Sequence, residues 1–153
     1  MVPTVSKTER IAIVPKDKNV LPISKLRGVP HQLRVALKTR KITNCGQLLE
    51  AAAEADKRDR LVRGLNLDPE LVKRTVQRAD LARIDGVGAV FGMMLEDLGI
   101  MDVADVKEQD PVQLHEVLDR YNKSERLARR SPTPEEVQYW IDQAKALDAL
   151  ITY

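Results

Sequence analysis

Leu26-Arg27-Gly28-Val29-Pro30 and Ile84-Asp85-Gly86-Val87-Gly88 are two versions of one short segment, placed 58 positions apart in the chain. They lie inside two longer stretches, residues 23–48 and 81–106, which align without a gap. In each copy a short apolar turn with glycine at a fixed place precedes a helical pattern of apolar residues. An internal repeat of this kind predicts two copies of one folding unit.

The helix after each turn is amphipathic. Its apolar residues recur at i, i+3 and i+4, with Leu33, Ala36 and Leu37 in the first copy and Phe91, Met94 and Leu95 in the second. Strand patterns are almost absent from the chain, and residues 1–22 are interrupted by three prolines. The sequence therefore predicts an all-α fold, a tandem helix-hairpin-helix domain with an extended N-terminal arm.

The predicted boundaries follow from the repeat. The arm covers residues 1–22 and the domain covers 23–153, with repeat 1 at about 23–80 and repeat 2 at about 81–153. Helix starts are predicted by capping residues, several of them followed by proline at the first helical position. These starts are Thr43 or Asn44, Asp68-Pro69, Asp102, Asp110-Pro111 and 131–134. Gly64 and Gly99 are predicted to end helices, because glycine accepts the left-handed conformation.

Composition limits the protein class. The chain has 153 residues, of which 43% are hydrophobic and 3% aromatic, enough for one domain with an aliphatic core. It has no apolar run of 18 residues, so no membrane span is expected. A single cysteine, Cys45, excludes an internal disulfide and fits a reducing compartment. The N-terminal residues lack an apolar signal core, so a cytoplasmic location is expected.

The two copies of the repeat differ in charge. The net charge of +2 combines +8 in residues 1–49 with −6 in residues 50–153. Segment 23–49 has six basic residues and no acidic one, whereas segment 81–119 has two basic residues and nine acidic ones. The copies thus share a fold pattern and carry opposite charge.

The turns are the candidate functional site. Glycines at a tight interhelical turn leave backbone N–H groups exposed at a helix N-terminus, where a phosphate oxygen can bind without any base being read. The second copy offers these donors, and the first offers basic side chains. The candidate nucleic-acid-binding residues are Arg27, Gly28, Arg34, Lys38, Arg40, Lys41, Gly86, Val87, Gly88 and Ala89.

Each copy also has a feature that opposes phosphate binding. Pro30 stands where the second copy has Gly88, and proline has no N–H to donate. In the second copy Asp85 lies in the turn and Glu96-Asp97 follow on the helix. The structural alternative is that the glycines only permit a sharp turn, and that the basic residues form a solvated face.

Nothing in the sequence indicates catalysis. His31 and His115 are far apart and have no cysteine partners at metal-ligand spacing, so no metal site is expected. No nucleophile triad or phosphate-binding P-loop occurs, and basic residues do not alternate with aromatic ones. We expect a protein that is not an enzyme and needs no cofactor.

With these features described, the chain resembles a bacterial family known only as a domain of unknown function, which is similar to tandem helix-hairpin-helix DNA-binding domains. The resemblance covers about residues 22–146 and departs from the hairpin pattern at Pro30, and at Lys41 where the second copy has Gly99. It implies a compact all-helical domain without catalytic activity and with DNA binding as an expectation. The residues that carry it are 48–52, 78–81, 84–88, Leu95 with Gly99, Leu114-His115, Asn122, Arg129-Arg130, Pro134, Val137 and 140–145.

Two functions remain open from the sequence. The first is non-catalytic, sequence-independent binding of duplex DNA, with basic side chains attracting the backbone and 86–89 donating to phosphates. The second is a protein–protein interaction adaptor, in which the basic and acidic copies meet partner surfaces, or each other in a homo-oligomer, through complementary charge.

Overall fold

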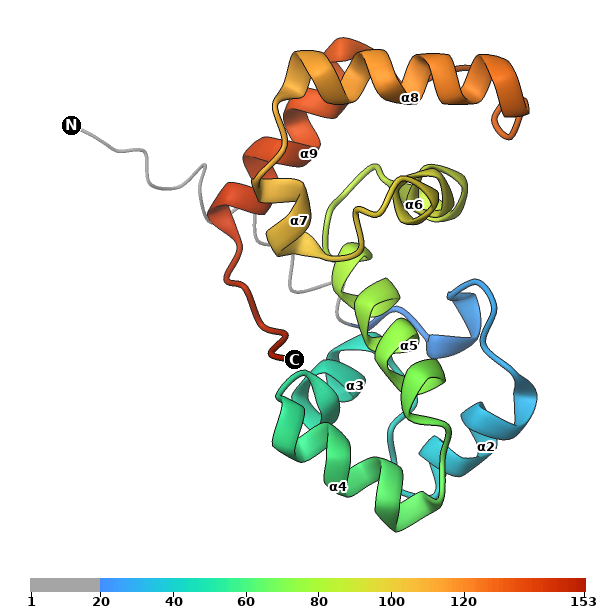
Figure 1. Ribbon diagram of the computed structural model, residues 1–153. Helices are drawn as coiled ribbons and strands as arrows, with labels where there is room; N and C mark the ends of the chain where they lie inside the picture. Colours follow the sequence, from blue (N-terminus) through green and yellow to red (C-terminus); the bar gives the residue numbers. More distant parts are fainter. Residues whose placement is uncertain (1–19) are drawn as a thin grey trace, which may run out of the picture. The chain divides into compact units, whose positions relative to one another are not determined.

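The computed structural model describes residues 20–153 of the chain. Over these residues it contains eight α-helices, one short 3-10 helix (η2, Ile23–Lys25) and no strand, only an isolated bridge between Pro22 and Asn44 (Figure 1). The all-α prediction is confirmed. Most of the predicted N-terminal arm, residues 1–19, lies outside the described residues.

The chain divides into two compact units. We call residues 20–83 with Leu150–Tyr153 the N-terminal unit, and Ile84–Ala149 the C-terminal unit. The last four residues thus pack with the first unit, whereas the sequence boundary assigned them to repeat 2. Thr152 holds them there, because its N–H donates to Ala53 O at 3.0 Å and its Oγ1 accepts from Ala55 N at 2.8 Å.

The N-terminal unit is built from four helices around an aliphatic core. They are α2 (His31–Lys38), α3 (Cys45–Ala52), α4 (Ala55–Leu65) and α5 (Pro69–Leu81), with α3 packed against α4 and α5. Leu37, Leu48 and Val76 are completely buried where these helices meet. Burial of such apolar side chains is the main stabilising contribution in a small helical unit.

The C-terminal unit also has four helices. They are α6 (Gly88–Asp97), α7 (Val103–Lys107), α8 (Pro111–Glu125) and α9 (Pro134–Ala146), with α9 packed against α7 and α8. Trp140 and Ile141 on α9 are buried together with Leu95 of α6 and Leu118 of α8. The apolar residues of α9 and its C-cap are all buried, namely Val137, Trp140, Ile141, Ala144 and Leu147.

Two pairs of positions 58 apart share a positive φ, although Pro30 and Gly88, with φ of −64° and 68°, do not. Gly28 and Gly86 both have positive φ, at 71° and 90°, and so do Lys41 and Gly99, at 61° and 84°. The correspondence extends to the fourth helices at a spacing of 65, because α5 and α9 each have 13 residues and each begin with proline. Four buried positions then match in pairs, namely Val72 with Val137, Thr75 with Trp140, Val76 with Ile141 and Ala79 with Ala144.

The caps repeat as well. Asn44 caps α3 by accepting from Gln47 N at 2.8 Å, and Asp102 caps α7 by accepting from Asp105 N at the same distance. The Gln47 and Asp105 side chains in turn accept from the backbone N–H just before each cap, on Thr43 and Met101. Asp68, Asp110 and Thr133 cap α5, α8 and α9 as predicted. These reciprocal bonds satisfy helix-end donors that have no partner within the helix.

The predicted helix end near Gly64 is confirmed, because α4 ends at Leu65, and Asn66 adopts the left-handed conformation with φ of 53°. Asparagine tolerates that conformation better than most residues, so it can replace glycine at a helix end. The apolar stripe of α6 is less completely buried than its pattern indicates: Phe91 is only partly buried, whereas Met94 and Leu95 are fully buried.

Candidate nucleic-acid interface

The first turn, residues 26–30, is fixed to the core of its unit by its apolar residues. Leu26 and Val29 pack against the buried cluster, while Arg27 and Gly28 are exposed. Pro30 is the N-cap of α2, which begins at His31. The proline therefore removes one donor just outside the helix, and the first N–H groups of α2 itself still lack acceptors within the helix.

A side chain from the fourth helix holds this turn. Arg78 of α5 donates from Nη1 to Arg27 O at 2.9 Å. A Cβ placed on Gly28 would lie 2.8 Å from the same nitrogen. Two properties therefore favour glycine at this position: the φ of 71° and the close approach of the guanidinium.

The second turn, residues 84–88, is held in the corresponding way. Gln143 of α9, which is fully buried, donates from Nε2 to Asp85 O at 2.9 Å and accepts from Asp85 N at 2.7 Å. Gln143 follows Arg78 by 65 positions and Asp85 follows Arg27 by 58. Each unit therefore clamps the residue before its positive-φ glycine with a side chain from its own last helix.

A comparison of the sequence with known protein families gives a match that covers parts of both units. The model of a domain of unknown function, DUF4332, matches residues 27–147, from the first turn to the end of α9. The chain belongs to the DUF4332 family. No curated protein and no solved structure matches it. The DUF4332 match includes both clamped turns and stops before Leu150–Tyr153.

In this DUF4332 domain the donors of the second turn face solvent. Gly86, Gly88 and Ala89 are exposed, whereas the Val87 side chain is 3% exposed and anchors the turn in the core. Gly88 and Ala89 are the first two residues of α6, so their N–H groups have no acceptor within the helix. The positive end of the α6 dipole lies at the same place. Three of the four predicted residues thus present exposed backbone, and Val87 has a structural role.

Acidic residues of α6 are separated from these donors. Glu96 and Asp97 lie at the other end of the helix, about 12 Å away at 1.5 Å per residue. The carboxylate of Asp97 also accepts from the hydroxyl of Tyr121 at 2.7 Å, an interaction that raises the pKa of Tyr121. Asp85 remains close to the turn, so it is the acidic residue that opposes a phosphate there.

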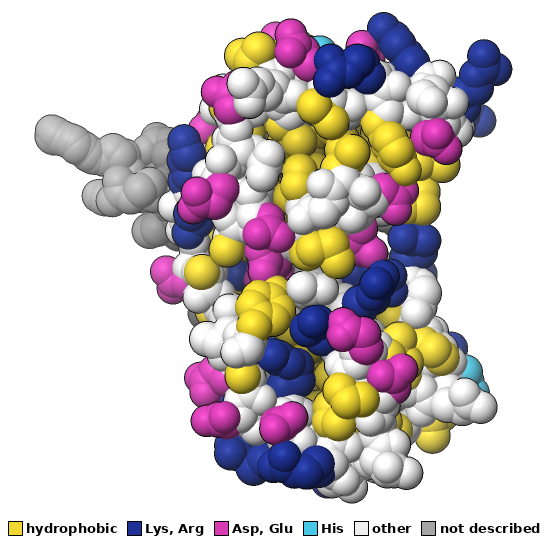
Figure 2. Space-filling model, viewed as in Figure 1, with side chains coloured by type: hydrophobic (Ala, Val, Ile, Leu, Met, Phe, Trp, Pro, Cys, Tyr) yellow, Lys and Arg dark blue, Asp and Glu magenta, His cyan; other side chains and the backbone are white. Residues whose placement is uncertain are grey.

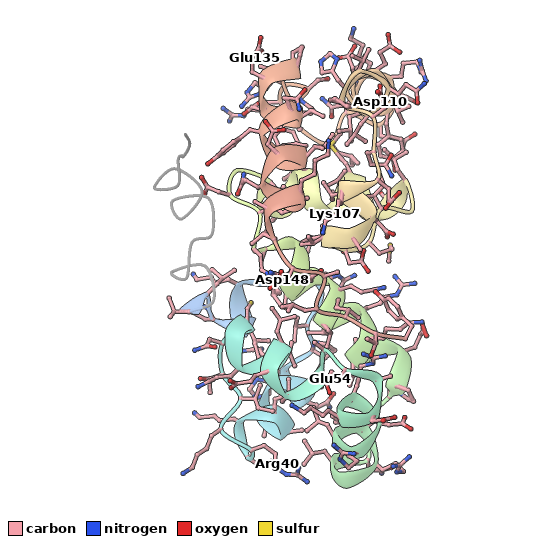
Figure 3. All side chains as sticks on the ribbon, turned by 90° about the vertical axis from the view of Figure 1, so that its left-hand side faces the viewer. Arg40, Glu54, Lys107, Asp110, Glu135 and Asp148 are labelled. Carbon is pink, nitrogen blue, oxygen red and sulfur yellow. The ribbon has the colours of Figure 1, made fainter. Side chains whose placement is uncertain are left out.

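The predicted basic residues of the first copy fall into two groups. Arg27 lies in the turn, and Arg34, one turn into α2, is partly buried with Nη2 3.4 Å from Nδ1 of His31. Arg40 and Lys41 lie beyond the C-terminal end of α2, so the structure does not place them at the Gly28 turn (Figure 3). Lys38 is in the last turn of α2, where its positive charge interacts favourably with the negative end of the helix dipole.

Sequence reasoning missed the two clamping residues. Arg78 adds a guanidinium to the first turn, and Gln143 takes the same role in the second. Their correspondence appears in the sequence only when the repeat is extended past a seven-residue difference in spacing, from 58 to 65. The gapless alignment of 23–48 with 81–106 stops before that point.

Residues 20–153 contain no group of three His, Cys, Asp or Glu side chains able to hold a metal ion. Over the same residues, no helix is long and apolar enough to cross a membrane. Cys45 is buried in the N-terminal unit, and desolvation raises the pKa of its thiol to about 11, so the thiolate is scarce at neutral pH.

Proposed function

We propose that this DUF4332 domain binds duplex DNA without reading its sequence, as a tandem helix-hairpin-helix domain whose two turns contact phosphates. One observation carries the proposal. Two turns of the same design, each with a positive-φ glycine and a clamp from the last helix, come before a helix N-terminus. Rigid turns with exposed N–H groups are suited to phosphate oxygens, which carry no sequence information.

The two turns would contribute differently. The first supplies cations, through Arg27 and Arg34, and Arg78 adds positive charge behind the turn. The second supplies backbone donors at Gly88 and Ala89. The proposal involves no catalytic step, and it places the protein in the cytoplasm, where a buried free thiol such as Cys45 stays reduced.

Substitutions in the two turns test the proposal. Gly88 has a φ of 68°, which proline cannot adopt, so the N–H is best removed at the next residue. Ala89→Pro removes one donor from the first helical turn, where proline is tolerated, and Ala89→Ser keeps it. In a fluorescence anisotropy titration with duplex DNA, Ala89→Pro should bind more weakly than Ala89→Ser, with circular dichroism confirming equal helicity.

The basic side chains need a second variant. Arg27, Arg34 and Lys38 replaced together by Gln should bind all duplex sequences more weakly, with a salt dependence flattened by about one unit for each lost phosphate contact. If the wild-type protein shows no binding to duplex DNA at low salt, the proposal is wrong.

A second function, a protein–protein adaptor, has one observation in its favour. Acidic residues predominate in segment 81–119 and basic ones in segment 23–49, so the copies differ in charge while sharing their backbone design. Complementary surfaces of this kind steer protein partners, including a second copy of the chain. Sedimentation of the wild-type protein at low and high salt would detect such self-association as a salt-sensitive increase in mass.

A further inference from the structure

A groove in the N-terminal unit contains no residue of the Gly28 turn. Its volume is about 710 Å³, and it is open to solvent on one side. Residues from three places line it: the segment after α2 (Arg40, Lys41, Ile42), α3 (Gln47, Glu50, Ala51) and α4 (Lys57, Arg60, Leu61). Figure 2 shows Lys and Arg side chains gathered along the lower edge of this unit, over α4.

The charge of the groove is strongly positive. Four cations line it, Arg40, Lys41, Lys57 and Arg60, against one carboxylate, Glu50. None of the four makes an ion pair with another residue of the described part of the chain, although Arg63 on the same helix pairs with Asp59 at 3.1 Å. Cations gathered without counter-ions repel one another, so an anion that binds among them relieves that repulsion.

Two local features that accompany these cations lower the stability of the folded unit. Gly64 stands inside α4, where glycine is about 1 kcal/mol less favourable than alanine. Its missing side chain leaves room for Arg40, whose Nη2 would lie 2.7 Å from a Cβ on Gly64. Lys41 has a φ of 61°, a conformation that costs a non-glycine residue about 1–2 kcal/mol and that Gly99 adopts in the second copy. Departures from local preference of this kind are expected at functional positions.

The lining also indicates the chemistry of the ligand. It contains no aromatic side chain on which a base could stack, and of its three apolar members Ile42 and Leu61 are buried and Ala51 is partly buried. An enclosed apolar pocket suits a small molecule, whereas an open basic groove suits a chain of phosphates. We infer that this groove is a second phosphate-binding surface that receives the sugar–phosphate backbone of the bound nucleic acid. The inference rests on the proposed function and adds α4 to the binding surface.

A pair of double variants tests this inference. Lys57→Gln with Arg60→Gln removes two groove cations that lie outside both turns. Arg74→Gln with Lys145→Gln makes the same change of charge at exposed positions on α5 and α9, away from the groove lining. Each variant is titrated against one fluorescent DNA duplex at several salt concentrations, and circular dichroism shows that each is folded.

We expect the groove variant to bind about tenfold more weakly than wild type, with a salt slope lower by about two. The control variant should stay within about twofold of wild type, because neither Arg74 nor Lys145 lines the groove or lies in a turn. If the groove variant and the control bind alike while wild type binds DNA, the groove inference is wrong and the proposed function stands. If wild type does not bind DNA at all, the proposed function fails, and nucleic acid is excluded as the ligand of the groove.

Discussion

At the scale of single residues, Gly28 and Gly99 show two different reasons why a position needs glycine: a positive φ and the lack of space for a Cβ. Both have positive φ, at 71° and 84°. Nothing lies within 4 Å of a Cβ built on Gly99, whereas a Cβ on Gly28 meets the guanidinium of Arg78. The backbone conformation penalises alanine at both positions, and only at Gly28 does alanine also displace a hydrogen-bonded side chain.

Gly99→Ala is therefore expected to lower the free energy of unfolding by about 1–2 kcal/mol, the cost of the left-handed conformation. Gly28→Ala should cost about 1 kcal/mol more, because Arg78 must release Arg27 O. Urea unfolding measured by circular dichroism gives both values. In an Arg78→Ala background the extra cost should disappear; if it persists, the clamp is not its cause.

At the scale of elements, helix starts are set by side chains that the sequence displays. Asp102 was identified as a cap from residue type and position, Asn44 as one of two candidates with Thr43, and Thr133 within the break at 131–134; all three cap in the structure. The end of α4 near Gly64 was also predicted, but the left-handed residue is Asn66, because both residues can adopt positive φ and packing selects between them.

The candidate site was less predictable than the helices. Arg40 and Lys41 follow the first turn closely in sequence, yet they line a groove with α4 that depends on tertiary packing. The clamps by Arg78 and Gln143 join residues 51 and 58 positions apart, and no local periodicity reports such contacts. The docking of Leu150–Tyr153 rests on hydrogen bonds to groups at least 76 positions away, which leave no local pattern of residue types.

The N-terminus of α9 should make stability depend on pH. Glu136 accepts from both Nη groups of Arg130, at 2.7 and 2.9 Å, and from Thr133 N at 2.8 Å. The side-chain bond from Arg130, followed by the backbone bond from Thr133, lowers the pKa of Glu136 from 4.5 to about 2. Because the folded state holds the carboxylate below its ordinary pKa, this stabilisation is present above about pH 4.5 and is lost as pH falls toward 2.

Glu136→Gln should accordingly flatten the loss of thermal stability between pH 5 and 2, and the difference from wild type should shrink in high salt because the pair is partly exposed. Melting temperatures measured by circular dichroism across this range test it. If the melting temperatures of the two proteins fall in parallel between pH 5 and 2, ionisation of Glu136 contributes nothing to stability.

At the scale of the whole molecule, the last four residues pack with the N-terminal unit, although they follow the C-terminal unit in sequence. Arg58, buried on α4, donates to Ala52 O, Ala53 O and Thr152 O, at 3.2, 3.0 and 2.8 Å. Gln77 donates to the hydroxyl of Tyr153 at 2.9 Å. The tail thus supplies hydrogen-bond partners for groups of the N-terminal unit that its removal would leave incompletely satisfied.

Removal of residues 150–153 should lower the free energy of unfolding by roughly 2–4 kcal/mol, the sum expected for several partly buried hydrogen bonds. Tyr153→Phe loses the bond from Gln77 and should cost about 1 kcal/mol. Urea unfolding followed by circular dichroism gives both values. A truncated protein with an unchanged midpoint would show that the tail contributes no stability.

The central claim is that the whole domain binds the phosphates of duplex DNA and ignores its bases. The most direct measurement is the affinity of the wild-type protein for two duplexes of unrelated sequence and equal length, each at a series of salt concentrations. Phosphate binding predicts equal affinities at every salt concentration and a steep linear fall of log K with log salt, from the release of counter-ions. A strong preference for one duplex, an affinity indifferent to salt, or no binding at low salt would contradict the account.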